Sequence, residues 1–216
     1  QLGENLVDIA REKAGIVSRG ATLICGVADN DALNAVRSVV KDKGARLVSV
    51  DTSGKSARAS CEAVANAALR SFETLHGLVR GDISFEGFTI PGRDDIRTIG
   101  DSKVLFDGAH TPASLADLAL RLPLRFEGKP VLVFYCTPPR DPLTLAGVLE
   151  HACSKRFYLV RHEGQGVPKG FEPLPICSLP DFVRLEKACV ITGSFHAVGD
   201  SMKILRVEPY PHSPCA

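Results

Sequence analysis

The chain has 216 residues, of which 44% are hydrophobic and 24% are charged, and its formal net charge is +1. This is the composition of an ordinary globular protein, with enough residues for one or two domains and a real core. The balanced charge argues against a general attraction to nucleic acid or to a membrane surface, and no apolar run approaches the roughly 18–20 residues of a membrane span.

Helices and strands alternate through the first part of the chain. The predicted elements, in order, are a helix over 2–13, a strand over 22–27, a helix from 30 to about 43, a strand over 46–50 and a helix over 56–75. Asp29 and Asn30 offer a cap for the second helix, and Gly44 ends it. The stretch 78–93 is rich in turn residues and closes on Pro91-Gly92-Arg93.

A second alternating series follows. It contains strands over 104–106, 131–136, 157–160 and 189–192 and helices over 115–122, 143–153, 179–186 and 198–205. We predict a loop over 164–175 and a disordered tail after Val207. Strands that alternate with helices predict parallel sheets and the α/β fold class. The polar segment 93–101 separates the two series, which predicts domains over 1–94 and 95–216.

The seven cysteines are odd in number and form no C-x-x-C pair, and several lie in apolar strand patterns. We interpret them as buried free thiols in a reducing compartment and expect no zinc site. They are Cys25, Cys61, Cys136, Cys153, Cys177, Cys189 and Cys215.

The stretch VLFDGAHTP, residues 104–112, is the most informative in the chain. An apolar strand stops at Asp107, and His110 precedes Thr111-Pro112, which is a good start for a helix. In open α/β sheets, ligands bind at the carboxyl ends of strands, and helix N-termini favour anions. Asp107 and His110 are therefore a candidate ligand-facing pair, and the alternative is a capping acid beside a surface imidazole.

Ser194 takes a similar place after the strand CVIT, in the sequence Gly193-Ser194-Phe195-His196. Its hydroxyl can cap a helix or bind an anion. A Ser/His/Asp hydrolase built from Ser194, His110 or His196 and Asp107 is conceivable, but the G-x-S-x-G elbow of that class is missing.

Two cations are further candidates. Arg93 follows Pro-Gly and is either a solvated loop residue or a fork for phosphate. Lys13 shares a helix face with Leu6 and Ile9, which is typical of an extended side chain lying along apolar surface. A desolvated lysine amine can instead react with carbon dioxide, and the resulting carbamate is an oxygen ligand suited to magnesium. The segment DTSGKS, 51–56, misses the phosphate-loop spacing and is interpreted as a turn.

Four motifs in order resemble the folylpolyglutamate synthase and dihydrofolate synthase family of the Mur ligase superfamily. LGENLVDIAREKAGI at 2–16 resembles the family's LGxTLxxIAxEKAGI block, and PGR at 91–93 resembles the end of its central domain. FDGAHTP at 106–112 resembles DGAHNP, and TGSFHAV at 192–198 resembles the family's last strand end. The resemblance implies the end of a central ATPase domain followed by a Rossmann-like domain.

The resemblance also implies a reaction and a set of roles. ATP would phosphorylate the γ-carboxylate of a folate, and the amine of L-glutamate would displace the phosphate. Lys13, as a carbamate, would ligate magnesium, and Arg93 and Asp107 would contact the nucleotide. His110 and Ser194 would close the site and place glutamate. His110 would also contact the nucleotide. We expect a cytoplasmic monomer, or a mitochondrial one in a eukaryote.

The departures from the family pattern define the alternatives. The family's phosphate loop and its metal-binding histidine segment are absent, Cys61 and Thr111 stand where asparagines are usual, and Asn5 replaces threonine. Because the chain starts at Gln1 rather than at Met and the family's phosphate loop is absent, we expect a partial chain, inactive alone. No signal peptide is visible. Dihydrofolate synthesis, a non-catalytic module derived from the ligase, and a Mur-type ligase for cell-wall peptides are the alternatives.

Overall fold

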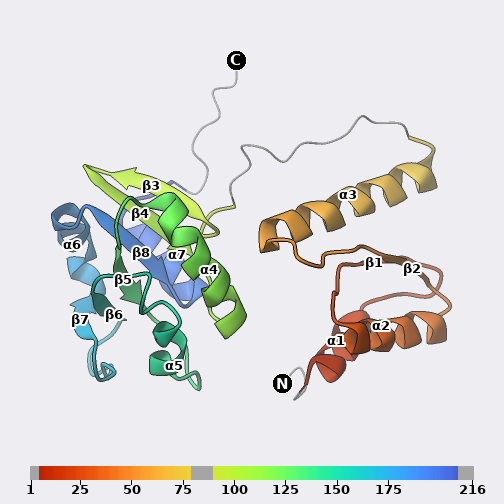
Figure 1. Cartoon of the computed structure of the whole chain (residues 1–216), viewed down its shortest axis with the longest axis horizontal. Helices are drawn as coiled ribbons and strands as arrows, with labels where there is room; N and C mark the ends of the chain where they lie inside the picture. The colour runs from red at the N-terminus through yellow and green to blue at the C-terminus, as the bar shows by residue number, and fades with distance from the viewer. Residues whose placement is uncertain (1–4, 79–89, 209–216) are drawn as a thin grey trace. The chain divides into compact units, whose positions relative to one another are not determined.

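The computed structural model describes residues 5–78 and 90–208, and the chain divides into two compact units, residues 1–86 and 87–216 (Figure 1). Each unit has its own hydrophobic core. The boundary predicted at residues 94 and 95 stays a prediction. Leu2, most of the turn-rich stretch 78–93, the tail beyond Glu208 and Cys215 lie outside the described residues.

Within residues 5–78, the first unit contains a two-stranded parallel sheet and three helices. Its elements are α1 (Leu6–Ala14), β1 (Thr22–Cys25), α2 (Asn30–Asp42), β2 (Arg46–Ser49) and α3 (Ala57–His76). Asp29 caps α2 as predicted, accepting a hydrogen bond from the Ala32 amide. The core lies largely between α1 and α2, where small and branched residues such as Ala10, Ala14 and Val36 are buried. The DTSGKS segment is a turn, whose Ser56 caps α3.

The second unit is built on a six-stranded sheet of order β3-β4-β8-β5-β6-β7. Its strands are β3 (Asp95–Ile99), β4 (Ser102–Asp107), β5 (Val131–Phe134), β6 (Arg156–Val160), β7 (Glu172–Pro175) and β8 (Ala188–Thr192). Its helices are α4 (Pro112–Arg125), α5 (Pro142–Gly147), α6 (Leu179–Leu185) and α7 (Phe195–Ile204), with a short 3-10 turn at Ile176–Ser178. All strand pairs are parallel except β3 with β4, which confirms the α/β class.

The strand order places helices on both faces of this sheet. The connection through α4 runs from β4 towards β5, whereas the connection through α6 returns from β7 to β8 in the opposite direction. Because such crossovers are right-handed, opposite directions put the helices on opposite faces. Figure 1 shows α4 on the near side of the sheet and α7 behind it. The strands between them are buried on both faces, as the all-buried pattern of β5 shows.

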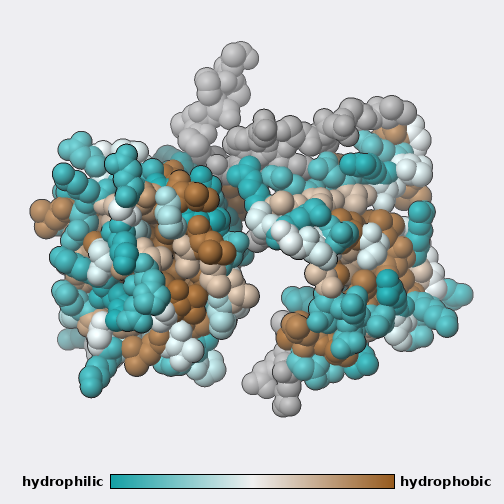
Figure 2. Space-filling model, in the orientation of Figure 1, coloured by the Kyte–Doolittle hydropathy of each residue, from teal (hydrophilic) through white to brown (hydrophobic). Residues whose placement is uncertain are grey.

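The surface of the second unit carries exposed apolar residues over α4. Figure 2 shows hydrophilic residues over much of the visible surface, with hydrophobic patches in the region of α4. Leu120 and Leu124, both on α4, are mostly exposed. Among the described residues, no helix is long and apolar enough to cross a membrane.

The structure differs from the predicted elements in two strands and in several bounds. β3 and β7 were not predicted, α5 is shorter than the predicted helix 143–153, and α4 continues through Pro123 to Arg125. α7 starts at Phe195, immediately after the strand-end glycine and serine, rather than at residue 198. The cysteines within residues 5–78 and 90–208 are free, as predicted. Those at Cys25, Cys136, Cys153 and Cys189 are buried, whereas Cys61 and Cys177 are exposed.

Candidate functional site

The carboxyl ends of β4 and β8 lie side by side, which brings the DGAH and GSFH segments together. Asp107 is in register with Thr192 on the neighbouring strand. Beyond the strands, the Gly193 amide donates to the Ala109 carbonyl oxygen at 2.9 Å, and the Thr192 hydroxyl donates to the same oxygen at 3.2 Å. Two motifs more than eighty residues apart are thereby joined into one edge.

Asp107 is buried beneath this edge, with 3% of its surface exposed. One carboxylate oxygen accepts from the Ala109 amide at 2.8 Å, and the other accepts from the Asp94 amide and from the Arg121 guanidinium, both at 3.1 Å. The Asp107 carboxylate therefore connects the DGAH loop to the turn at Asp94, which precedes β3. The nucleotide contact expected from the family resemblance stays a prediction.

Arg121, on α4, is the centre of a charged cluster that the sequence did not reveal. Its guanidinium pairs with Asp107, with Asp94 at 2.8 Å and with Asp117 at 2.9 Å. Burial lowers the pKa of Arg121, but the neighbouring carboxylates outweigh it, so the pKa lies above its ordinary value. Asp94 also binds Arg125 at 2.5 Å, which fixes the turn before β3 to α4.

His110 is half-buried, and its ring orientation follows from one hydrogen bond. Its Nδ1 lies 2.7 Å from the Gly108 carbonyl oxygen. Because a carbonyl can only accept, Nδ1 carries the proton and Nε2 of the neutral ring is left as an acceptor. No described contact joins His110 to Asp107, so the histidine–aspartate half of a Ser/His/Asp triad is not formed in the described residues.

Phe195 is a site residue that the sequence reasoning missed. The Arg93 guanidinium carbon lies 4.1 Å from the centre of its ring, and the His110 ring centre lies 5.8 Å away, edge to face. The ring also occupies the space into which a side chain at Gly108 would project. Phe195 thus links three segments of the edge. A Phe directly after a strand-end Gly-Ser, at a helix start, is the signal that could have indicated it.

Ser194 is the N-cap residue of α7, but its side chain makes no capping hydrogen bond. The residue is only 4% exposed. Gly193, just before it, has φ +99, and a Cβ there would overlap the Tyr135 carbonyl oxygen, so only glycine suits this position. The strand end therefore presents a buried hydroxyl without a capping partner beside the free amides of a helix N-terminus, which favours an anion.

Lys13 lies on α1 in the first unit and is exposed. The buried face of α1 is formed by Ala10 and Ala14, whereas Leu6 is mostly exposed, so Lys13 does not share a buried face with it. Among the described residues, no group of three or more His, Cys, Asp or Glu could hold a metal ion. Carbamylation of Lys13 and its role as a magnesium ligand stay predictions.

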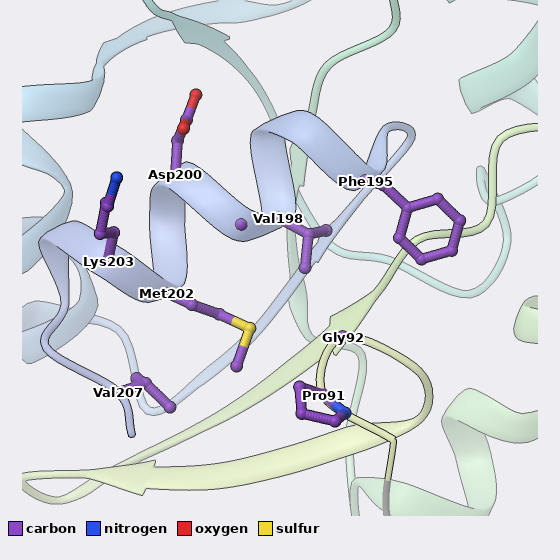
Figure 3. A pocket seen from close by; sticks show the side chains of 9 residues that line it. Pro91, Gly92, Phe195, Val198, Asp200, Met202, Lys203 and Val207 are labelled. Carbon is purple, nitrogen blue, oxygen red and sulfur yellow. The ribbon is translucent and has the colours of Figure 1, made fainter. Parts of the chain in front are cut away.

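A cavity of about 460 Å³ lies beside the edge, between α7 and the Pro91-Gly92 turn. Figure 3 shows Phe195, Val198 and Met202 on the side of α7 that faces this turn, while Asp200 and Lys203 point away from it. The cavity is lined by Pro91, Gly92, Phe195, Val198, Gly199, Asp200, Met202, Lys203 and Val207. The lining residues that face the turn are apolar, and the two charged lining residues, Asp200 and Lys203, come from the part of α7 that points away from it.

No protein-family model and no curated protein matches the sequence. Solved structures do match. The chain superposes on a Yersinia pestis bifunctional folylpolyglutamate synthase/dihydrofolate synthase complexed with AMPPNP and Mn ion, with a TM-score of 0.74 and 18% identity, over 96% of this chain and 58% of that one. A Mycobacterium tuberculosis folylpolyglutamate synthase complexed with ADP and AMPPCP gives a TM-score of 0.71 at 19% identity, over 97% of this chain and 62% of that one.

A further bifunctional synthase structure, with Mn, AMPPNP and L-glutamate bound, gives a TM-score of 0.72 at 19% identity, over 96% of this chain and 59% of that one. The chain therefore has the fold of folylpolyglutamate synthases along nearly its whole length, as the motif resemblance predicted. It spans about three-fifths of the length of these neighbours.

Proposed function

We propose that this chain is part of an ATP-dependent ligase that joins L-glutamate to the γ-carboxyl of a folate through an acyl phosphate. The fold shared with folylpolyglutamate synthases over about 96% of the chain is the observation that carries the proposal. The two motifs of the family resemblance, DGAH and GSFH, meeting at one sheet edge support it. Neighbours complexed with AMPPNP, with ADP or with L-glutamate are consistent with both ligands.

In this proposal the chain's own residues contribute charge and orientation. Arg93, exposed and positively charged, neutralises phosphate oxygens. The Ser194 hydroxyl and the N-terminus of α7 bind an anionic group, which we assign to the glutamate carboxylate or a phosphate. His110 Nε2 is an acceptor at the same edge. Catalysis by such groups is positioning and charge stabilisation of the acyl-transfer intermediate. Asp107 keeps this edge assembled.

Magnesium belongs to the proposal only through Lys13, whose carbamate would supply oxygen to the ion. Magnesium prefers about six oxygen ligands in octahedral arrangement. Lys13 provides one group, and the described residues bring no metal-binding cluster beside it. We therefore assign the ion no step that this chain carries out.

Dihydrofolate synthesis is the alternative candidate, and the bifunctional synthases among the structural neighbours carry both activities in their names without favouring it. It uses the same chemistry with a pteroate acceptor in place of a folate. The two activities are separated by assaying the natural protein with each acceptor, MgATP and labelled glutamate.

The test is ligation by the natural protein that contains this chain. Asp107→Ala and His110→Ala should each lower the rate by at least about tenfold, equivalent to roughly 1.4 kcal/mol of barrier. Asp117→Ala is the matched control, because Asp117 pairs with the same Arg121 from the more exposed side and should leave the rate within about twofold. Circular dichroism of each variant separates lost folding from lost chemistry. Wild-type rates in both Asp107 and His110 variants, or no conjugate from the natural protein, would overturn the assignment.

We also propose that the 216-residue chain by itself does not turn over ATP, since DTSGKS forms a turn rather than a phosphate loop. Magnesium-dependent release of phosphate by the purified chain, abolished in Arg93→Ala, would contradict this.

A further inference from the structure

Arg93 is a cation whose acidic sequence neighbours are both paired elsewhere. Asp94 binds Arg121 and Arg125, and Asp95 binds Arg97 at 2.6 Å. Within residues 5–78 and 90–208, no carboxylate forms an ion pair with Arg93. Its positive charge is therefore left for a ligand, and its side-chain position depends on another kind of contact.

That contact is the Phe195 ring. The guanidinium carbon of Arg93 is 4.1 Å from the ring centre, well inside the range of about 6 Å for a cation–π interaction. The ring also contacts His110 at its edge and lies close to the bare backbone of Gly108. Because Phe195 is the first residue of α7, the ring comes from the helix whose N-terminus carries Ser194.

We propose that Phe195 is a positioning residue that holds the Arg93 guanidinium at the carboxyl edge of the sheet for the phosphate oxygens of a nucleotide, an inference that rests on the proposed ligase function. A cation–π contact orients the guanidinium without neutralising it, whereas a carboxylate would do both. The Arg93 charge thus stays available, and its side chain loses less conformational freedom when the nucleotide binds.

The contact is tested first without any ligand, by NMR of arginine side chains in the full chain. The Arg93 Nε–H signal, assigned by its loss in Arg93→Ala, should lie at lower frequency than those of exposed arginines, because it sits over a ring face. Phe195→Tyr should keep this shift, and Phe195→Leu should remove it. An unshifted Arg93 signal in the wild type, or an unchanged one in Phe195→Leu, overturns the proposal.

The role of the contact is then tested in the natural protein that contains this chain, by titrating MgATP and following the same signal. Phe195→Leu should weaken binding by about two- to fivefold, the range expected for a cation–π contact near the surface, while Phe195→Tyr binds like the wild type. In the Arg93→Ala background, followed by isothermal calorimetry, Phe195→Leu should have no further effect. A merely structural role would instead weaken binding in both backgrounds.

The matched control is Phe72→Leu, which removes another half-exposed ring next to a histidine, in the first unit, and should change neither the shift nor the affinity. If Phe195→Leu binds MgATP as the wild type does, the positioning role is wrong and the proposed function stands. If the wild-type Arg93 signal is shifted by the ring but does not respond to MgATP at millimolar concentration, the nucleotide role of this edge is wrong, and the positioning role falls with it.

Discussion

Gly108 and Gly193 lie at the two strand ends that make the candidate site, and they exclude a side chain for different reasons. A Cβ at Gly193 would overlap the Tyr135 carbonyl oxygen, and its φ of +99 is unfavourable for any other residue. A Cβ at Gly108 would overlap the Phe195 ring, which is 41% exposed and can move. Displacing the Tyr135 backbone would cost more free energy than displacing the half-exposed Phe195 ring.

Alanine substitutions should therefore separate the two positions. We expect Gly193→Ala to cost more than about 3 kcal/mol of unfolding free energy, through combined strain and overlap. Gly108→Ala should cost about 1–2 kcal/mol, and it should also remove the ring-current shift of Arg93 by displacing Phe195. Urea unfolding followed by circular dichroism measures the free energies. Gly199→Ala, at an open site on α7, is the control and should stabilise by about 0.5–1 kcal/mol. Equal costs at residues 108 and 193 would contradict this reasoning.

Part of the candidate site could be predicted from the sequence. Asp107, His110 and Ser194 stand at strand ends before helices, and local pattern finds such places. Arg121 could not be found this way, because its link to Asp107 depends on how α4 packs against the sheet. Phe195 was missed because its contacts with Arg93 and Gly108 join segments far apart in the sequence, which local pattern does not show.

At the scale of elements, α4 shows how a departure from the family pattern can leave local structure intact. Thr111 stands where the family motif has asparagine, and it caps α4 by accepting from the Ser114 amide at 3.2 Å. In return, the Ser114 hydroxyl oxygen accepts hydrogen bonds from the Thr111 and His110 amides. The reciprocal arrangement is a capping box, and it fixes the backbone directly after the site histidine.

The cap should tolerate asparagine and not alanine. Thr111→Ala is expected to destabilise the second unit by about 1 kcal/mol, because the Ser114 amide loses its partner. Thr111→Asn should stay within about 0.5 kcal/mol of the wild type, since both side chains are good N-caps. Chemical denaturation of the two variants decides between them. A loss as large in Thr111→Asn as in Thr111→Ala would show that the threonine matters beyond capping.

The two strands missed by prediction have physical causes in their sequences. β3 begins with Asp95, which is buried and paired with Arg97, and a charged pair in a short segment is typical of a loop. β7 reads EPLP, and two prolines ordinarily argue against a strand. At the edge of a sheet, however, proline needs no partner for its missing N–H, and β7 is an edge strand. The long, periodic elements were predicted well, and short edge elements were not.

At the scale of the whole second unit, the core encloses groups that resist ionisation. Burial raises the pKa of the Cys153 and Cys189 thiols to about 12, from 9.0. Burial, followed by the nearby Cys136, raises the pKa of Tyr158 to about 12, from 10.0. In the unfolded chain these groups ionise at their ordinary pKa values. Their stabilising contribution is thus complete below pH 9 and is lost as the pH rises towards 12.

The unfolding free energy of the second unit should accordingly fall as the pH is raised above about 9. Replacing both thiols, in Cys153→Ala with Cys189→Ala, should make this fall shallower, because the unfolded chain then has fewer protons to release. Urea unfolding at a series of pH values measures both slopes. The exposed pair Cys61→Ala with Cys177→Ala is the control and should leave the slope unchanged. Identical slopes in the wild type and the buried-thiol variant would contradict the assignment.

The order of strands in the second sheet has a consequence for biosynthesis. β8 lies between β4 and β5, yet it is translated after every other strand of that sheet. Until residues 188–192 emerge from the ribosome, β4 and β5 have no common partner, and each exposes an unpaired, strongly apolar edge. Insertion of one strand then closes the sheet and brings the DGAH and GSFH segments together in a single step. We therefore expect a nascent chain paused before β8 to be more aggregation-prone than the completed second unit.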